Sequence, residues 1–311
     1  MGEAQAPGPP LGPVGIWAME LRSPSPQTLE AVSALDDMGT QAMWVPGLDG
    51  HDVLNDVDAL LTAAPNATVA LGVLSIWSQT AEQLGTRLSS LDRRHGPRAL
   101  VGLGVSNPHA AALAGRSYGT PTESMRAYLE ELDGIPDAVP VHRRILGALG
   151  PRMVDVAAAH SAGWHPFLVP PAYVHRERRR LGPMPIIAPH QAVVLDTDAA
   201  TARAVARAGV GMYIGFPAYR SNLARLGFTE ADLVSGGSDR LIDALVAHGS
   251  VDDVAARVRE HLDAGADHVA LHVLSSDPQV RGGPGGQAPV AEWKELAPLL
   301  TEQGGRVVRH H

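Results

Sequence analysis

The feature that most constrains the fold of this chain is a regular alternation between short apolar runs and segments with helical periodicity. Four apolar runs follow one another in the first third of the sequence: Val14–Trp17, Ala42–Val45, Val69–Leu74 and Ala99–Gly104. Runs that are apolar on both faces are typical of parallel strands covered by helices. The alternation therefore predicts a series of βα units.

Helix start signals stand between these runs. Ser25 is a preferred N-cap residue, and Pro26 after it suits the first helical position, so a helix is expected to follow. Two further helices are expected to begin with capping boxes, at Thr80 and at Thr120, because Gln and Glu stand three residues later. These signals place helices where the alternation requires them.

The second half repeats the pattern less regularly. Strands are expected at Arg144–Ala148, at Trp164–Leu168, within Met184–Leu195 and at His268–Val273. The last two are separated by a helix at Ala199–Ala208, an irregular aromatic stretch over Met212–Phe228, and helices at Arg240–Ala247 and Val251–Ala264. Eight βα units close naturally into a barrel. We therefore predict an α/β fold, a (β/α)8 TIM barrel with an irregular insertion between strands 7 and 8, in preference to an open doubly wound sheet. One barrel domain is expected over residues 13–302, with flexible ends at 1–12 and 303–311.

Composition narrows the functional classes. Lys and Arg number 25 against 33 Asp and Glu, a formal net charge of −8, which lacks the cationic footprint of a nucleic-acid or membrane-surface binder. No apolar run is long enough to span a bilayer, and the first residues do not resemble a signal peptide, so a cytoplasmic location is expected. The chain has no cysteine, and Lys294 is its only lysine, which argues against thiolate chemistry and Schiff-base enzymes. No metal site is expected, because Trp17-Ala18-Met19 ends the first strand where metal-dependent barrel hydrolases carry paired histidines.

Glycines and histidines gather where the predicted strands end, which is the functional face of a parallel barrel. Gly104-Val105-Ser106 follows the fourth strand, and the segment from Gly147 to Met153 follows the fifth and opens a helix. Backbone N–H groups at such a helix start can bind a phosphate, although simple turn chemistry also explains the glycines. The segment from Gly72 to Ser75 fits either a bulge that approaches a flat ligand or a buried strand that simply ends.

Together these segments resemble the luciferase-like monooxygenase superfamily, and more narrowly its actinobacterial branch of coenzyme F420-dependent oxidoreductases. The resemblance extends over residues 14–300. It rests on Trp44-Val45-Pro46-Gly47, residues 71–77, Leu91-Asp92, residues 101–106, residues 146–153 and Gly163-Trp164-His165-Pro166. It implies a (β/α)8 barrel that binds F420, or less often FMN, at the carboxyl ends of its strands, frequently as a homodimer.

The resemblance also implies roles for individual residues. In such barrels a bulge after the third strand, often with a non-prolyl cis peptide, backs the cofactor ring, and the cofactor carries the hydride chemistry. The implied cofactor-binding residues are Gly72, Val73, Leu74 and Ser75 in the bulge, Gly104 and Ser106 after strand four, and Gly147, Ala148, Gly150, Pro151 and Met153 after strand five. His109 and His165 are the candidates for proton transfer, and Trp44 would shape the pocket.

Three places depart from this pattern. Gly47 stands where relatives commonly carry Glu, and Ala162 where they commonly carry Asp. Where some relatives carry an acid or base Glu after strand four, this chain has Asn107 and His109. We predict an F420-dependent oxidoreductase that moves a hydride between the deazaflavin and a small organic substrate, such as an activated C=C, a C=N or an alcohol/carbonyl pair. Two alternatives stay open. One is an FMN-dependent monooxygenase of the same superfamily, and the other is a catalytically degenerate barrel that binds flavin or only a partner.

Overall fold

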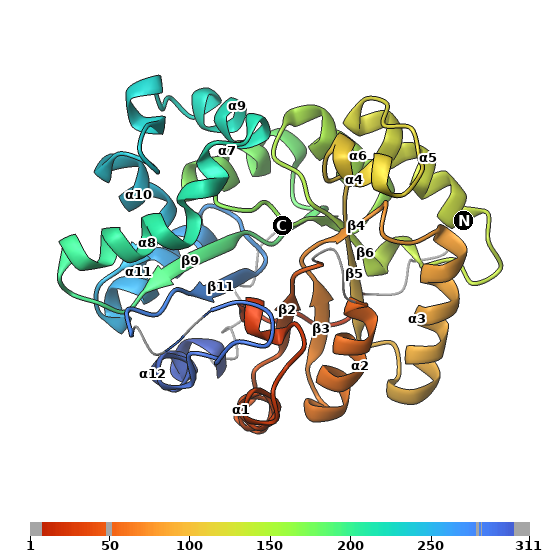
Figure 1. Ribbon diagram of the computed structural model, residues 1–311, viewed down its shortest axis with the longest axis horizontal. Helices are drawn as coiled ribbons and strands as arrows, with labels where there is room; N and C mark the ends of the chain where they lie inside the picture. The colour runs from red at the N-terminus through yellow and green to blue at the C-terminus, as the bar shows by residue number, and fades with distance from the viewer. Residues whose placement is uncertain (1–7, 48–51, 278–279, 281, 302–311) are drawn as a thin grey trace.

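The computed structural model describes residues 8–47, 52–277, 280 and 282–301, in which a curled sheet of parallel strands is surrounded by helices (Figure 1). The strands are β1 (Val14–Trp17), β2 (Ala42–Val45), β3 (Thr68–Leu71), β4 (Leu74–Ser75), β5 (Ala99–Gly104), β6 (Arg144–Leu146), β7 (Gly163–Trp164), β8 (Ile186–Ile187), β9 (His190–Val194), β10 (Val246–His248) and β11 (Val269–Val273). The α-helices are α1 (Pro26–Asp37), α2 (Val53–Ala63), α3 (Ala81–His95), α4 (Pro108–Leu113), α5 (Pro121–Asp133), α6 (Pro151–His160), α7 (Pro171–Leu181), α8 (Ala199–Ile214), α9 (Pro217–Arg225), α10 (Asp239–Leu245), α11 (Val251–Asp263) and α12 (Val290–Thr301). Of the ends expected to be flexible, residues 1–7 and 303–311 lie outside the described residues.

The predicted barrel is confirmed, and the segment from β8 to β9 closes it. The strand order is β10-β9-β11-β1-β2-β3-β5-β6-β7-β8, with β4 paired to β5 and all pairs parallel. On one side of the closing segment, Ala188 N donates to Trp164 O at 3.0 Å. On the other side, Ala270 N donates to Pro189 O at 2.9 Å. These two bonds connect β7 through residues 186–190 to β11, so the sheet returns to its starting strand.

The helices begin at the signals that the sequence carries. Ser25 Oγ accepts a hydrogen bond from Thr28 N at 3.2 Å, and Pro26 is the first residue of α1. Complete capping boxes open α3 at Thr80 and α5 at Thr120. Each cap satisfies backbone N–H groups that the first helical turn leaves unpaired.

The second half differs from the prediction in three places. Of the strand expected at Trp164–Leu168, only Trp164 lies in β7. The helix expected at Arg240–Ala247 ends at Leu245, and the next three residues form β10 against β9. The insertion expected to be irregular is largely helical, because α8 continues to Ile214 and α9 begins at Pro217. Proline suits the first position of a helix, so Phe216-Pro217 marks a new helix inside the aromatic stretch.

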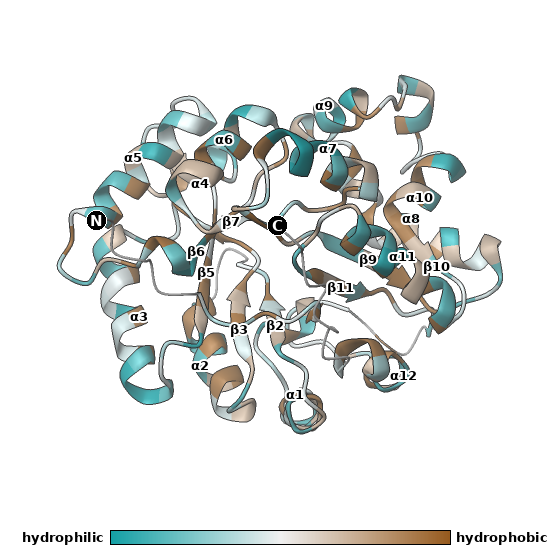
Figure 2. Cartoon of the chain, turned by 180° about the vertical axis from the view of Figure 1, so that it is seen from behind, coloured by the Kyte–Doolittle hydropathy of each residue, from teal (hydrophilic) through white to brown (hydrophobic). Residues whose placement is uncertain are grey.

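Apolar side chains fill both the space around the sheet and the barrel interior. The interior cluster combines small and large side chains: Ala42, Ala70, Ala188 and Ala270 with Leu100, Ile145, Trp17 and Trp44. Figure 2 shows hydrophobic colour along the strands, whereas the surrounding helices mix hydrophobic and hydrophilic residues. Among the described helices, none is both long enough and apolar enough to cross a bilayer.

Candidate functional site

The barrel interior contains an unusual set of rings for a core, namely four buried histidines beside two buried tryptophans. His165 follows β7, and His190 is the first residue of β9. His268 precedes β11, and His272 lies within it. Trp17 ends β1, and Trp44 lies within β2. His268, Ala270 and His272 alternate along β11, so they share one face of the sheet. This set forms a lower and an upper layer.

In the lower layer, Trp44 contacts two histidines. Trp44 Nε1 donates to His268 Nε2 at 2.9 Å, and His268 Nδ1 in turn donates to Gly12 O at 2.9 Å. The indole of Trp44 also stacks on the His165 ring, with centroids 4.4 Å apart and planes 14° apart. His165 Nδ1 donates to Ala188 O at 2.7 Å, which leaves Nε2 as a bare lone pair that is buried without a partner among the described residues.

The upper layer lies nearer the carboxyl ends of β1 and β11, where Trp17 ends β1 and His272 is the last residue but one of β11; we call this side of the barrel its mouth. His190 Nε2 and His272 Nδ1 are 3.0 Å apart and hydrogen bonded. Trp17 meets both rings, with centroid distances of 5.1 Å to His190 and 4.4 Å to His272. Phe167 stacks on the other side of His190 at 3.7 Å. The His190–His272 pair is therefore held between aromatic rings.

Burial keeps these imidazoles neutral. Desolvation lowers the pKa of His165 and of His268 to about 4 and that of His272 to about 3. The pKa of His190 also lies well below its usual value, first because of burial and then because His272 and His165 are close. A charged imidazolium loses its hydration in such an environment, so the interior is polar but uncharged.

The bulge after β3 is present and directs one side chain toward the barrel mouth. The Gly72–Val73 peptide is cis, as the resemblance implies. A Cβ on Gly104 would lie 2.6 Å from Val73 Cγ2, and one on Gly147 would lie 3.1 Å from the same atom. Both distances are tighter than ordinary contact, so these two glycines make room for Val73. The glycine signal after strands four and five therefore has a packing cause in addition to its predicted role at a cofactor ring.

Gly47 has a similar explanation. A Cβ there would lie 2.5 Å from both Leu74 Cα and Val73 O. Gly47, the second residue after β2, thus packs directly on the backbone of the bulge, and this contact leaves no space for a glutamate side chain. Arg22 holds the backbone next to Gly47 in place. Its Nη1 donates to Pro46 O at 3.0 Å, and its Nε donates to Asp56 at 2.6 Å.

The segment after β6 leads into α6, whose N-terminus has no side-chain cap. Gly150 is the N-cap of α6 and Pro151 its first residue, and no side chain caps this end. The Arg225 guanidinium, from the last turn of α9, lies 3.6 Å from the position of a Cβ on Gly150. Arg225 is exposed and forms no ion pair with any described residue. A helix N-terminus beside an unpaired cation is suited to an anion such as a phosphate.

Aromatic residues of the insertion extend the upper layer outward. The Phe167 ring lies 5.0 Å from Tyr213 and 6.4 Å from Tyr219, both on helices of the insertion. Phe216 joins this cluster 6.0 Å from Tyr213 and is 44% exposed. Burial raises the pKa of both tyrosine hydroxyls. The cluster forms an apolar wall next to the His190–His272 pair.

The other predicted site residues take separate positions. His109 lies in the first turn of α4 with an exposed side chain, and no contact joins it to His165. Ser106 is exposed with φ +50°, whereas Ser75 is buried and accepts a hydrogen bond from Trp77 N at 3.3 Å. Ala148 and Met153 are buried. The structure thus brings Trp44 and His165 together and leaves His109 apart from them.

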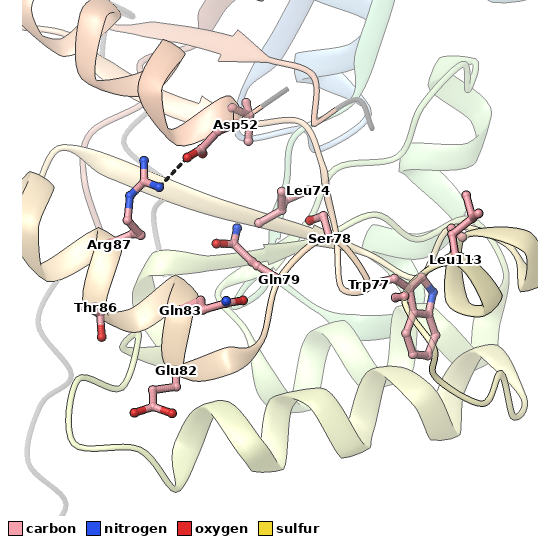
Figure 3. A pocket seen from close by; sticks show the side chains of 13 residues that line it. Asp52, Leu74, Trp77, Ser78, Gln79, Glu82, Gln83, Thr86, Arg87 and Leu113 are labelled. Carbon is pink, nitrogen blue, oxygen red and sulfur yellow. Dashed lines mark hydrogen bonds and ion pairs between the residues drawn. The ribbon is translucent and has the colours of Figure 1, made fainter. Parts of the chain in front are cut away.

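A separate pocket lies outside the barrel mouth (Figure 3). It has a volume of about 890 Å³ and lies among β4 and the helices α2, α3 and α4. Leu74 of the bulge and Trp77 line it, and an ion pair between Asp52 and Arg87 lies at one side. Among the predicted site residues only Leu74 reaches this pocket, and no histidine of the described residues lines it.

Two features of the site were not assigned from the sequence. The first is the His190–His272 pair, for which the alternation of His268, Ala270 and His272 was the available signal. The second is Arg225, which reaches Gly150 from a helix 75 positions later in the chain. Such a contact depends on how the insertion packs, and no local pattern records it.

Comparison with known proteins shows a shared fold. No family model and no curated protein sequence matches the chain. Among solved structures, an F420-dependent secondary alcohol dehydrogenase in complex with an F420-acetone adduct matches with a TM-score of 0.69 and 14% identity, over 93% of this chain and 99% of that one. The coenzyme F420-dependent tetrahydromethanopterin reductase of Methanopyrus kandleri matches with a TM-score of 0.66 and 15% identity, over 93% and 96% of the two chains. The EDTA monooxygenase of a Chelativorans species matches with a TM-score of 0.67 and 12% identity, over 95% and 94%.

Proposed function

We propose that this chain is a luciferase-like oxidoreductase that uses coenzyme F420 to move a hydride to or from a small organic substrate. The observation that carries the proposal is the match of its fold to two F420-dependent enzymes, each over 93% of the chain. Oxidoreductases and monooxygenases of this fold support an enzyme that uses a flavin or deazaflavin. The choice of F420 over FMN belongs to the proposal.

The residues at the mouth fit such a cofactor. The uncapped N-terminus of α6 and the Arg225 guanidinium would hold its phosphate, and the backbone of the bulge would back its ring. When bound, F420 supplies the hydride acceptor or donor. The chain itself supplies a dry, uncharged floor of imidazole and indole rings, which excludes water from a hydride transfer.

The remaining roles are part of the same proposal. His165 and His109 are its candidates for proton transfer, Trp44 shapes the floor, and the substrate is an activated C=C, a C=N or an alcohol/carbonyl pair. We also propose that the protein acts as a homodimer with a small-molecule substrate as its partner.

One alternative has a specific observation in its favour. Monooxygenases are among the structural matches, including a type II Baeyer–Villiger enzyme of Pseudomonas putida in complex with FMN, with a TM-score of 0.61. An FMN-dependent monooxygenase would consume oxygen with reduced FMN, whereas the F420 enzyme would not.

Equilibrium titration of the purified protein with F420 and, separately, with FMN tests the proposal. We expect F420 to bind tightly and FMN weakly, as followed by cofactor fluorescence. Tight binding of FMN with oxygen consumption would replace the proposal by the monooxygenase. Binding of neither cofactor would leave a degenerate barrel. With a bound cofactor, His165→Ala and His109→Ala variants that both keep full turnover would refute the proton-transfer roles.

A further inference from the structure

The eight ring nitrogens of the interior histidines are not equivalent. Five of them are hydrogen bonded: both nitrogens of His268, Nδ1 of His165, Nε2 of His190 and Nδ1 of His272. Two are buried without a partner among the described residues, namely His165 Nε2 and His190 Nδ1. His272 Nε2 belongs to neither group. It lies near the carboxyl end of β11, on a side chain that is 8% exposed.

The hydrogen bond within the pair fixes which nitrogens carry protons. If His272 Nδ1 donated to His190 Nε2, the proton of neutral His190 would lie on Nδ1, a buried donor without a partner. If His190 Nε2–H donates instead, the buried Nδ1 is only a bare lone pair. Buried orphan donors are rarer in proteins than under-satisfied acceptors. His190 therefore donates to His272, and His272 carries its own proton on Nε2, directed to the mouth.

The surroundings of this donor define the ligand it suits. Phe167, Tyr213 and Tyr219 form an aromatic wall beside the pair. Burial lowers the pKa of His272, and burial followed by the neighbouring His272 and His165 lowers that of His190, which its own backbone raises slightly. No carboxylate or cation of the described residues contributes to either shift. An ionised ligand would lose its hydration there without a compensating charge, whereas an uncharged acceptor loses little.

We propose that the His190–His272 pair is the substrate-binding site of the mouth, in which His272 Nε2–H donates a hydrogen bond to the oxygen or nitrogen of an uncharged, flat carbonyl or imine compound. His190 is a positioning residue, because it holds the His272 ring in the donor tautomer. The inference rests on the proposed function, since it names the substrate class of the same site. It predicts that an aromatic amide binds and that the corresponding carboxylate does not.

The test uses the cofactor-free protein, so that its outcome is separate from the F420 titration. Long-range ¹H–¹⁵N spectra of the histidine side chains report which nitrogen of each ring carries the proton. We expect His272 protonated on Nε2 and His190 bare on Nδ1, and a shift of the His272 Nε2 signal when benzamide is added but not when benzoate is added. A proton on His272 Nδ1, or equal responses to the two probes, would overturn the proposal.

Matched variants separate the two nitrogens of His272. Asn places its amide near the position of Nδ1, so His272→Asn keeps a partner for His190 but loses the donor at the mouth. Gln places its amide near the position of Nε2, so His272→Gln keeps that donor. We expect His272→Asn to raise the benzamide Kd about fivefold, as for loss of one neutral hydrogen bond, and His272→Gln to stay near wild type. His175→Asn, an exposed position on α7, is the control. Equal benzamide binding by His272→Asn and wild type would contradict the site.

The role of His190 has its own readout. His190→Phe keeps an aromatic ring between Phe167 and Trp17 but cannot donate. We expect its ¹⁵N spectrum to show His272 as a mixture of both tautomers, and His190→Gln, which retains a donor, to restore the Nε2–H form. A His272 spectrum that is the same in His190→Phe and wild type would remove the positioning role. Because both spectra are recorded without F420, failure of cofactor binding would leave these results intact.

Discussion

At the residue scale, the mouth depends on the fit between one valine and the glycines that face it. A Cβ on Gly104 meets only the Val73 side chain at close range, whereas a Cβ on Gly102 would lie 1.7 Å from Leu71 O. The first conflict is with a side chain and the second is with backbone. The two glycines should therefore respond differently to the same change.

We predict that Gly104→Ala lowers the free energy of unfolding by about 1–3 kcal/mol, the usual cost of overpacking, and that Val73→Ala in the same chain recovers most of it. Gly102→Ala should cost more, and Val73→Ala should not rescue it. Urea unfolding of the single and double variants measures both effects. Strictly additive costs for Gly104→Ala and Val73→Ala would show that the two side chains do not compete for space.

At the element scale, α6 and α9 meet although they are far apart in the sequence, and their contact makes the predicted phosphate site. Removing Arg225 takes away the cation but leaves the helix N-terminus. We predict that Arg225→Ala raises the Kd for F420 about tenfold at low ionic strength, as expected for loss of one charge-assisted hydrogen bond. The difference should shrink in 0.5 M salt, because salt screens exposed charges and shortens the Debye length from about 30 Å at 0.01 M to well below about 10 Å.

Arg203→Ala is the matched control, because Arg203 lies on the neighbouring helix α8 and pairs with Asp239 and Asp243. Cofactor fluorescence titrations of wild type, Arg225→Ala and Arg203→Ala at two salt concentrations give the six Kd values that are needed. An Arg225→Ala variant that binds F420 as wild type at low salt would place the phosphate elsewhere.

The elements also show how far the sequence can be interpreted. Local signals were sufficient where the cause is local: the caps at Ser25, Thr80 and Thr120 depend on residues three positions away. They failed at β10, where Val246–His248 follows a helix directly and becomes a strand only because β9 offers an open edge. The same holds for the site. Trp44 and His165 were predicted singly, but their stacking and the His190–His272 bond arise from barrel closure, which no window of sequence contains.

At the scale of the whole molecule, the barrel encloses histidines that must stay neutral, and this makes stability depend on pH. His165 has a folded pKa of about 4, whereas an unfolded histidine has a pKa near 6.5. Between these values the unfolded chain binds a proton that the folded chain excludes. Stability is therefore complete above pH 6.5 and falls as the pH decreases toward 4, with a limiting slope of about 1.4 kcal/mol per pH unit for each such histidine.

The pH effects of His268 and His272 on stability have the same sign as that of His165, because burial lowers their pKa values to about 4 and about 3. The slopes add, so we predict that the free energy of unfolding decreases steeply between pH 6.5 and pH 4.5. Replacing His165 by Phe keeps a ring stacked on Trp44 and removes one titrating group, so that variant should lose stability less steeply, by up to about 1.4 kcal/mol per pH unit. His175→Phe, on an exposed face of α7, should leave the slope unchanged. Urea unfolding at half-unit pH steps measures all three proteins. If His165→Phe and wild type show the same slope, the interior already admits protons or water, and the dry floor assigned to the hydride transfer would have to be abandoned together with the neutral pair at the mouth.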